Sequence, residues 1–179
     1  MEAGSLPRGV SAQWLRELIE RLNQLGLKVA LDTSGEALRA ALQARPWLIK
    51  PNTEELADAL GCEVVSRAAE VQAAAQLHAQ GIEHVVISHG ADGVNWFSVG
   101  SALHASPPKV SVASTVGAGD SLLAGMLHGL LSADTPEQTL RTATAIAALA
   151  VTQIGFGIND AAQLAQLEQG VRVRPLTEQ

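Results

Sequence analysis

The chain has 179 residues, of which 47% are hydrophobic and 17% are charged, a composition that excludes intrinsic disorder and predicts a folded globular protein. The net charge of −6 argues against a nucleic-acid-binding surface, which needs clustered basic side chains. The longest apolar runs are too short to cross a bilayer, and Cys62 has no second cysteine for a disulfide. Because the first residues also lack a signal-peptide pattern, we expect a cytoplasmic protein without membrane contact.

The first half of the sequence alternates between helical and strand-like segments. Apolar residues recur at helical spacing over residues 11–25, and Gly26 follows as a stop signal. In chain order we then expect a strand at 27–31, a helix at 36–43, a strand at 47–49, helices at 53–60 and 67–80, and a strand at 84–88. This alternation predicts an α/β fold in which helices cover a mostly parallel sheet.

The second half has a different order of elements. Short strands are expected at 93–99, 101–106 and 110–112, separated by glycine and proline, and they predict an antiparallel edge of the sheet. Helices follow at 117–131, 135–151 and 160–169, and Thr135 and Asp160 have the pattern of helix N-caps. Because no repeat or linker separates these segments, we expect one domain over residues 1–179.

The chain opens on a Gly-Ser-Leu-Pro-Arg-Gly loop at residues 4–9. In open α/β folds, loops of this kind follow the ends of strands, where ligands bind. We therefore expect that a strand belongs before this loop and lies outside the chain.

The segment STVGAGDS at residues 114–121 carries the strongest signal for a ligand site. Gly117 and Gly119 allow close approach of the backbone, and the N–H groups of a helix that starts here would point toward an anion. Asp120 falls in the first turn, where the helix dipole favours a carboxylate. This combination suits phosphoryl transfer; the alternative is a tight turn in which Asp120 only complements the dipole. A dinucleotide fingerprint is excluded because Leu122 stands where it needs glycine, and a P-loop because Gly-Lys-Ser/Thr is absent.

Four ordered stretches resemble the ribokinase-like (PfkB-type) carbohydrate kinases: AGSLPRGV at residues 3–10, LIKPNTEEL at 48–56, VVISHGADGV at 85–94 and STVGAGDSLLAGMLHGLL at 114–131. The resemblance covers essentially the whole chain and is greatest to the bacterial fructose-1-phosphate kinases. It implies a Rossmann-type three-layer sandwich with a mostly parallel sheet and antiparallel edge strands. It also implies that the N-terminal strands of that sheet, and the lid over the sugar, are missing from this chain.

The resemblance implies specific catalytic roles. Asp120 would be the general base that deprotonates a sugar hydroxyl as it attacks the γ-phosphate of ATP, and Gly117, Ala118 and Gly119 would form the anion hole. The implied reaction converts fructose 1-phosphate to fructose 1,6-bisphosphate. Tagatose-6-phosphate kinase and 6-phosphofructokinase activities of the same family are the alternatives. Ser5 matches a position beside the substrate phosphate.

The same resemblance places Mg²⁺ beside Asn52 and Glu55, and places Lys50 and Asn52 next to the phosphates of the nucleotide. Mg²⁺ keeps much of its water and is often held by carboxylates through that water. From the residues alone, Asn52 and Glu55 also form a near capping box before an apolar helix. Both roles stay open.

Further nucleotide contacts implied by the resemblance are Ser88, Gly90, Gly93, Ser114, Thr115, Gly119 and Asn159. From the residues alone, the Ala-Asp-Gly sequence that ends at Gly93 makes an ordinary turn. His89 stands where leucine is common in the family, and we expect it to face water. We expect Asp32, at the end of a strand, to cap the following helix.

The sequence leaves three functional outcomes open. The chain is part of an ATP-dependent sugar-phosphate kinase, inactive as an isolated fragment, or a non-catalytic nucleotide-binding module, or a regulatory or interaction protein that keeps the fold without catalysis. The second follows if the absent lid and sugar contacts are needed to exclude water from the transition state. The expected partners are ATP, Mg²⁺ and a sugar phosphate. An exposed apolar sheet edge would also favour self-association into a homodimer.

Overall fold

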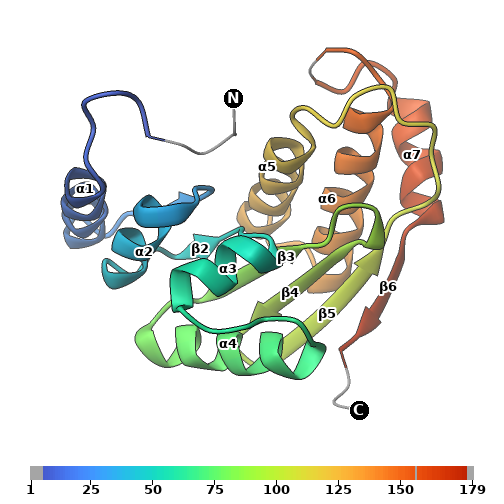
Figure 1. Cartoon of the computed structure of the whole chain (residues 1–179). Coiled ribbons are helices and arrows are strands. Elements are labelled where there is room, and N and C mark those ends of the chain that lie inside the picture. The colour runs from blue at the N-terminus through green and yellow to red at the C-terminus, as the bar shows by residue number, and fades with distance from the viewer. Residues whose placement is uncertain (1–5, 156, 177–179) are drawn as a thin grey trace. The chain divides into compact units, whose positions relative to one another are not determined.

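The computed structural model describes residues 6–155 and 157–176. They form two compact units: residues 6–88 and 96–101 make up the first, and the described residues of 89–95 and 102–176 make up the second. Helices and strands occur in both units, so the fold is α/β as predicted (Figure 1). The single domain over residues 1–179 stays a prediction. None of the helices in the described part of the chain is long and apolar enough to cross a membrane.

The first unit alternates helices with short parallel strands. Its elements are α1 (Ala12–Gln24), β1 (Ala30–Leu31), α2 (Gly35–Gln43), β2 (Leu48–Ile49), α3 (Thr53–Leu60), α4 (Arg67–Gln80) and β3 (His84–Ser88). β1 pairs in parallel with β2, and β2 with β3, because a helical connection returns the chain to the same end of the sheet each time. The carboxyl ends of these strands therefore meet at one edge, where open α/β sheets bind ligands.

Local sequence sets the bounds of α4. Ser66 caps its start, since Ser66 Oγ accepts a hydrogen bond from Ala69 N at 3.2 Å. Gly81 ends it in a left-handed conformation with φ of 102°, which carries little steric cost only for glycine. The sequence-based bounds of this helix are confirmed for these reasons.

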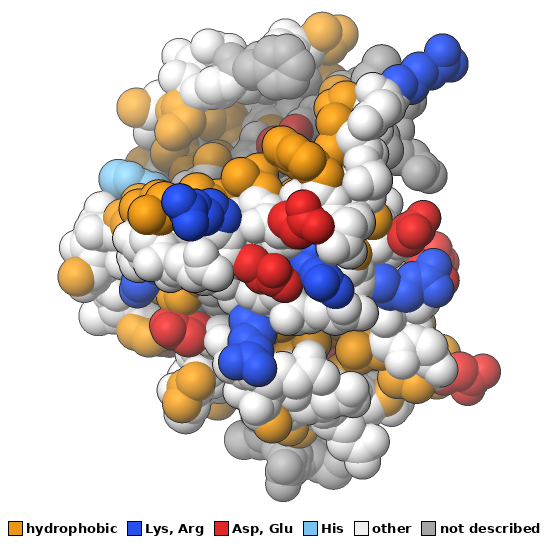
Figure 2. All heavy atoms as spheres, turned by 90° about the vertical axis from the view of Figure 1, so that its left-hand side faces the viewer, with side chains coloured by type: hydrophobic (Ala, Val, Ile, Leu, Met, Phe, Trp, Pro, Cys, Tyr) orange, Lys and Arg blue, Asp and Glu red, His pale blue; other side chains and the backbone are white. Residues whose placement is uncertain are grey.

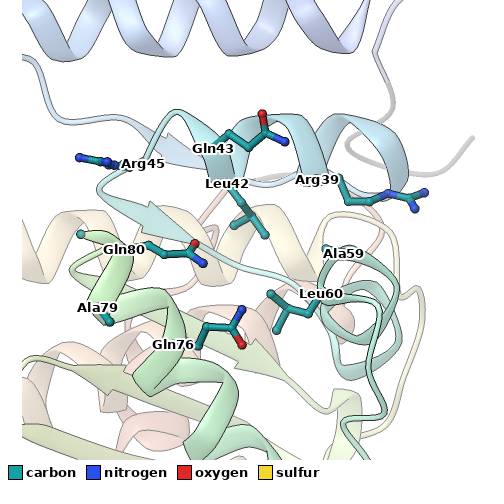
Figure 3. Close-up of a pocket in the computed structure, with 10 residues that line it drawn as sticks. Arg39, Leu42, Gln43, Arg45, Ala59, Leu60, Gln76, Ala79 and Gln80 are labelled. Atoms are coloured by element: carbon teal, nitrogen blue, oxygen red, sulfur yellow. The ribbon is translucent and has the colours of Figure 1, made fainter.

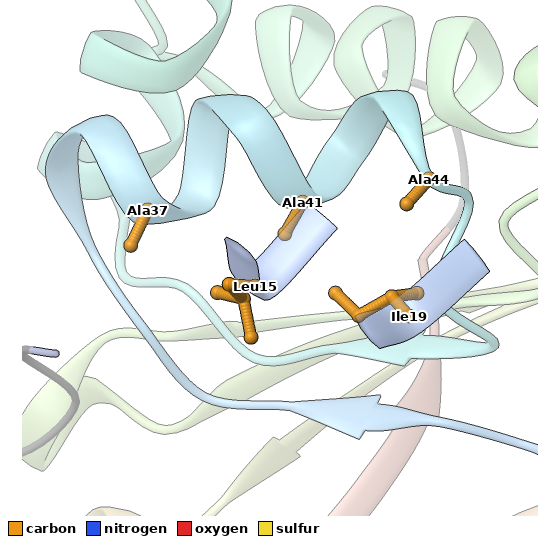
Figure 4. Packing of buried hydrophobic residues seen from close by; sticks show 5 residues of the cluster. All are labelled: Leu15, Ile19, Ala37, Ala41 and Ala44. Atoms are coloured by element: carbon orange, nitrogen blue, oxygen red, sulfur yellow. The ribbon is translucent and has the colours of Figure 1, made fainter. Parts of the chain in front are cut away.

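A core of small and branched residues joins α1 to α2. Leu15 and Ile19 of α1 are buried in one cluster with Ala37 and Ala41 of α2 and with Ala44, the C-cap residue of α2 (Figure 4). Alanine side chains let the two helices approach closely, and full burial of a leucine or isoleucine side chain contributes roughly 1.5–3 kcal/mol.

The outer side of α1 is only partly covered within the unit. Its apolar residues share helical spacing, yet Trp14 is 52% exposed and Leu25 is 62% exposed. Figure 2 shows the side of the molecule on which α1 and α2 lie, where hydrophobic side chains are scattered among charged side chains of both signs. Helical spacing thus predicted which side chains share a side of α1, but not which of them are buried.

The second unit contains a tight loop, most of a hairpin and a group of packed helices. Its elements are η1 (Gly90–Asp92), the first residues of β4 (Val94–Ser98), most of β5 (Ser101–Ser106), α5 (Ala118–Leu131), α6 (Pro136–Val151), α7 (Ala161–Gly170) and β6 (Arg172–Pro175). α5 packs on α6, and α6 packs on α7 (Figure 1). The predicted caps are confirmed: Thr135 Oγ1 accepts from Gln138 N, and Asp160 Oδ1 accepts from Gln163 N.

Two glycines bring α5 unusually close to α6. A Cβ atom on Gly125 would lie 2.6 Å from Ala143 Cα, and one on Gly129 would lie 2.6 Å from Thr139 Oγ1. Neither position accepts a larger residue unless the helices move apart. This contact fixes α5, whose amino end carries the predicted catalytic turn.

Hydrogen bonds order the strands as β1-β2-β3-β4-β5-β6. β5 and β6 are antiparallel, with Leu103 opposite Pro175 and Ser106 opposite Arg172. A parallel section and an antiparallel edge therefore coexist in a mixed sheet, which confirms the predicted class.

Two predictions about strands were wrong, and one strand was missed. Residues 110–112 form no strand, because β4 and β6 already flank β5, and Val112 is 62% exposed. The strand expected at 27–31 is limited to Ala30–Leu31. β6 was not predicted, because its sequence Arg-Val-Arg-Pro is charged and ends in proline, features that suit an edge strand but resemble a loop.

Candidate active site

Three strand ends meet at the ligand edge of the first unit. Asn52 forms a parallel bridge with Ser88, and Ser88 N donates to Pro51 O at 3.0 Å. Lys50 N donates to Leu31 O at 3.1 Å, which ties the end of β2 to the end of β1. The structure therefore brings Lys50, Asn52 and Ser88 together, three residues that the resemblance assigned to the nucleotide.

The ammonium group of Lys50 is ion-paired at this edge. Lys50 Nζ lies 3.0 Å from Asp32 Oδ2, and the two side chains are 7% and 18% exposed. Salt screens such a buried pair much less than a surface pair. The expectation that Asp32 caps the next helix was wrong, because Ser34 is the N-cap residue of α2 and Asp32 is held by its charge partner.

Asn52 and Glu55 form a complete capping box at the start of α3. Asn52 Oδ1 accepts from Glu55 N at 2.8 Å, and Glu55 Oε2 accepts from Asn52 N at 2.9 Å. The structural role left open by the sequence is thus confirmed. The box uses one position on the Glu55 carboxylate, whereas a carboxylate offers about four acceptor positions.

The donor set fits a hydrated magnesium ion better than a direct cage. In the part of the chain that the structure describes, no group of three or more His, Cys, Asp or Glu side chains is placed to hold a metal. Glu55 has acceptor positions left over for the waters of an ion, and Mg²⁺ usually keeps several waters.

In the second unit, the turn before α5 presents backbone donors. Gly117 is the N-cap, with φ of 81° and ψ of 0°, a conformation that favours glycine. Ser121 N donates to Gly117 O at 2.9 Å and Ala118 N donates to Thr115 O at a long 3.4 Å, whereas no described carbonyl accepts from the N–H groups of Gly119 or Asp120. These groups carry the positive end of the helix dipole, so the turn can hold an anion without a net positive charge.

The carboxylate of Asp120 is accessible. It lies in the first turn of α5, its side chain is exposed, and it makes no hydrogen bond or ion pair with another described residue. A ligand hydroxyl can therefore reach it beside the N–H groups of the same turn.

The chain that leads into this turn is anchored to the end of α6. Ala113 N and Ser114 N both donate to Val151 O, at 2.7 and 3.3 Å. Asn159 Nδ2 donates to Gln153 Oε1 at 3.4 Å, just beyond the same end of α6. Ser114 and Asn159, two predicted nucleotide contacts, are thus tied to one end of one helix.

Exposed aliphatic side chains lie in the segment that leads into α5 and in the segment that follows α6. Their exposed fractions are 62% for Val112, 73% for Val116, 90% for Ile154 and 51% for Ile158. Ligand sites combine apolar lining with a few polar groups, and a purine base presents a large apolar face. These segments, with the exposed Thr115, are suited to a nucleotide base.

The loop after β3 is a tight turn, as the sequence indicated. Gly93 N donates to Gly90 O at 3.3 Å. Gly93 has φ of 110°, and a Cβ atom there would lie 2.0 Å from Ala105 O, so this glycine is required by packing on β5. A Cβ atom on Gly90 would meet nothing within 4 Å, which leaves Gly90 open to a ligand.

His89 does not face water as expected. It is half-buried, and Asn95 Nδ2 donates to its Nε2 at 3.2 Å. Asn95 was missed by sequence reasoning, although a polar side chain inside a predicted apolar strand was a usable signal. Asp32 was recognised, but its partner could not be inferred because the ion pair joins two separate strands.

The first unit also has a groove of about 740 Å³ (Figure 3). It is lined mainly by the C-terminal halves of α2, α3 and α4, including Arg39, Leu42, Leu60, Gln76 and Gln80. None of the predicted site residues lines it. Ser5, the predicted substrate contact, lies outside the described residues.

The sequence matches the model of the pfkB family carbohydrate kinases over residues 2–162. It is 49% identical over 174 residues to the 1-phosphofructokinase of Vibrio cholerae, and 46% identical over 173 residues to that of Escherichia coli K12. Each match covers 97% of this chain and 55% of the relative. The chain therefore spans about half the length of the curated relatives it matches.

Solved structures show the same fold. Phosphofructokinase-2 from Escherichia coli in complex with substrates and products is 30% identical, with a TM-score of 0.83 over 93% of this chain and 54% of that one. The same enzyme in complex with potassium gives a TM-score of 0.84 over the same shares. These matches confirm the predicted ribokinase-like fold. The chain belongs to the pfkB family of carbohydrate kinases.

Proposed function

We propose that this chain supplies the nucleotide-binding and proton-accepting part of an ATP-dependent kinase that phosphorylates fructose 1-phosphate. The start of α5 carries the proposal, because the N–H groups of Gly119 and Asp120 have no acceptor among the described residues and lie beside the accessible carboxylate of Asp120. Fructose 1-phosphate is supported by the relatives named 1-phosphofructokinase, at 49% and 46% identity.

In this mechanism Asp120 accepts the proton of the C6 hydroxyl while that oxygen bonds to the γ-phosphorus of ATP. The bond between the γ-phosphorus and the β–γ bridging oxygen breaks, and ADP leaves. Backbone N–H groups at Gly117, Ala118 and Gly119 stabilise charge on the transferred group. A carboxylate is a sufficient base, because the proton moves late in a loose transition state.

The remaining predicted residues would hold the nucleotide and its metal ion. Lys50 would bring a positive charge to the phosphates, with Asn52 and Ser88 beside it on the same edge of the first unit. Glu55 would bind the waters of Mg²⁺, which neutralises phosphate charge when bound. In the second unit the proposed contacts are Gly90, Gly93, Ser114, Thr115 and Asn159. Ser5 is proposed to contact the sugar phosphate.

The test compares Asp120→Asn with Asp134→Asn in an assay of fructose 1-phosphate phosphorylation by MgATP. Asp134 is an exposed acid just beyond the other end of α5, where Asp134 N donates to Gly129 O, so its substitution removes the same charge. Loss of a general base lowers turnover by about 100- to 10,000-fold. We expect that loss for Asp120→Asn alone, with MgATP bound equally by both variants.

Equal turnover of the two variants would contradict the role of Asp120. Fructose 6-phosphate and tagatose 6-phosphate, assayed in parallel, test the choice of sugar, because a preference for either would overturn fructose 1-phosphate. Binding of MgATP with no turnover of any of the three would favour a nucleotide-binding module. A wild-type chain that neither binds MgATP nor phosphorylates a sugar would refute the proposal.

A further inference from the structure

Polar side chains that the proposed function does not use form a row across β4 and β5. Asn95 in β4 is only 6% exposed. Its Nδ2 donates to His89 Nε2 at 3.2 Å, and its Oδ1 accepts from His104 Nδ1 at 2.7 Å. His104 Nε2 lies 2.8 Å from Ser106 Oγ. These four residues belong to the second unit, and we call them the relay.

The chemistry of the amide group fixes where the protons are. An amide NH₂ can only donate, so His89 Nε2 must be unprotonated, and an amide oxygen can only accept, so His104 Nδ1 must carry a proton. In a neutral imidazole, His104 Nε2 then accepts from the Ser106 hydroxyl. Donation therefore runs in one direction, from Ser106 through His104 and Asn95 to His89, and hydrogen bonds in such a chain strengthen one another.

The relay ends at the loop proposed to contact the nucleotide. His89 N donates to Gly93 O at 2.8 Å, and Asp92 N donates to His89 O at 3.1 Å. The position of His89 therefore determines the geometry of residues 89–93. From the other side, His104 Cε1 would lie 3.3 Å from a Cβ atom on Gly93, so the relay and the backbone hold the loop against the same strand.

We infer that Asn95, His104 and Ser106 are positioning residues for the nucleotide loop. The relay fixes the ring of His89, and through it the conformation of residues 89–93, before a nucleotide binds. A loop that is ordered in advance loses less conformational entropy on binding, so the relay raises ATP affinity without contacting ATP. This nucleotide part rests on the proposed function, whereas the ordering of the loop does not.

A pair of substitutions at one position isolates the relay. Ser106→Ala removes its first donor, and Ser106→Thr keeps the hydroxyl. Ser98→Ala is the matched control. Ser98 ends β4, and its Oγ donates to Ser101 O at 3.4 Å at the start of β5, outside the relay. Asn95→Leu breaks the centre and is the strongest variant. If it fails to fold, the Ser106 pair still decides the question.

Hydrogen exchange of the Asp92 and Gly93 amides measures the order of the loop. Loss of a hydrogen bond should speed exchange by about 2- to 10-fold in Ser106→Ala, with recovery in Ser106→Thr and no change in Ser98→Ala. Nitrogen-15 spectra should show His89 Nε2 unprotonated and His104 Nδ1 protonated in the wild type. The dissociation constant for MgATP should rise by a similar factor in Ser106→Ala only.

Equal exchange in Ser106→Ala and Ser106→Thr would overturn the inference, as would the opposite protonation of the two histidines. Faster exchange in Ser106→Ala with unchanged MgATP affinity would overturn the nucleotide part. A wild-type chain that binds no MgATP would refute the proposed function instead, and the exchange rates would still decide whether the relay orders the loop.

Discussion

The candidate residues of the two units differ in how their polar groups are engaged. At the sheet edge of the first unit, Lys50 is paired with Asp32, and Asn52 is paired with Glu55. At the start of α5 in the second unit, Asp120 has no described partner. Groups that already have a described partner stabilise the fold and can also bind a ligand. A group without a described partner is available only to a ligand. Substitutions at the sheet edge should therefore lower stability. Substitutions at the start of α5 should lower activity and change stability little.

The largest effect on stability is expected for Asp32→Ala. It leaves the buried ammonium of Lys50 without its partner, which lowers the free energy of unfolding by about 3–5 kcal/mol. Asp58→Ala is the control, because Asp58 pairs with Arg39 at 3.6 Å with both side chains more than half exposed, and such pairs contribute about 0–1 kcal/mol. Urea denaturation measures both. Equal losses would contradict the claim that the buried pair at the sheet edge stabilises the fold more than an exposed pair does.

A smaller effect is expected at the capping box. Asn52→Ala removes the acceptor for Glu55 N and should lower the free energy of unfolding by about 0.5–2 kcal/mol. Asn52→Asp keeps an accepting oxygen and should retain most of the stability. If thermal denaturation shows Asn52→Ala as stable as the wild type, the capping box does not stabilise the first unit.

One histidine of the first unit adds a pH dependence that is separate from both regions. Trp96 Nε1 donates to His84 Nδ1 at 3.3 Å, a bond that needs the neutral ring. Burial lowers the pKa of His84 from its ordinary value of 6.5, with Lys28 and His78 adding to the effect and Glu83 opposing it. The unfolded chain therefore binds the proton more tightly than the folded one.

The sign of the pH effect follows from that difference. As pH falls from 6.5 through the lowered folded pKa, protonation favours the unfolded chain, so stability is lost on acidification in this window. His84→Gln should remove this part of the slope. Urea midpoints measured across the window for both proteins test it, and identical slopes would contradict the assigned pKa direction.

The smallest effect on stability is expected for Asp120→Asn. The substitution removes only the interaction of one exposed carboxylate with the helix dipole, about 0.3–1 kcal/mol and less at high salt. Urea denaturation at low and high salt measures it. A loss as large as that of Asp32→Ala would show that the fold engages Asp120, so that its carboxylate is not available to a ligand alone.

Local sequence was sufficient for the helices, because their signals lie within a few residues of each other. Asp160 and Gln163, for example, form the predicted cap of α7. The turn at Gly117 and Asp120 could be found for the same reason, since a glycine-rich start and an acidic first turn are adjacent in sequence.

Features that depend on distant partners could not be predicted in this way. Asp32 was expected to cap a helix, because its partner Lys50 comes from another strand. Trp14 belongs to the same apolar pattern as the buried Leu15 and Ile19, yet it is exposed. Helical spacing does not say which other element covers a given side chain. β6 was missed for the same reason, because it is a strand only where it pairs with the edge of β5.

The central claim is that the backbone at the start of α5 binds the phosphates of a nucleotide. A titration of the nitrogen-15-labelled chain with MgATP, followed at each backbone amide, tests it most directly. We predict that the signals of Gly117, Ala118, Gly119 and Asp120 shift together and saturate, while that of Gly129 at the far end of α5 stays in place. Saturable binding that leaves the four signals unchanged would contradict the claim.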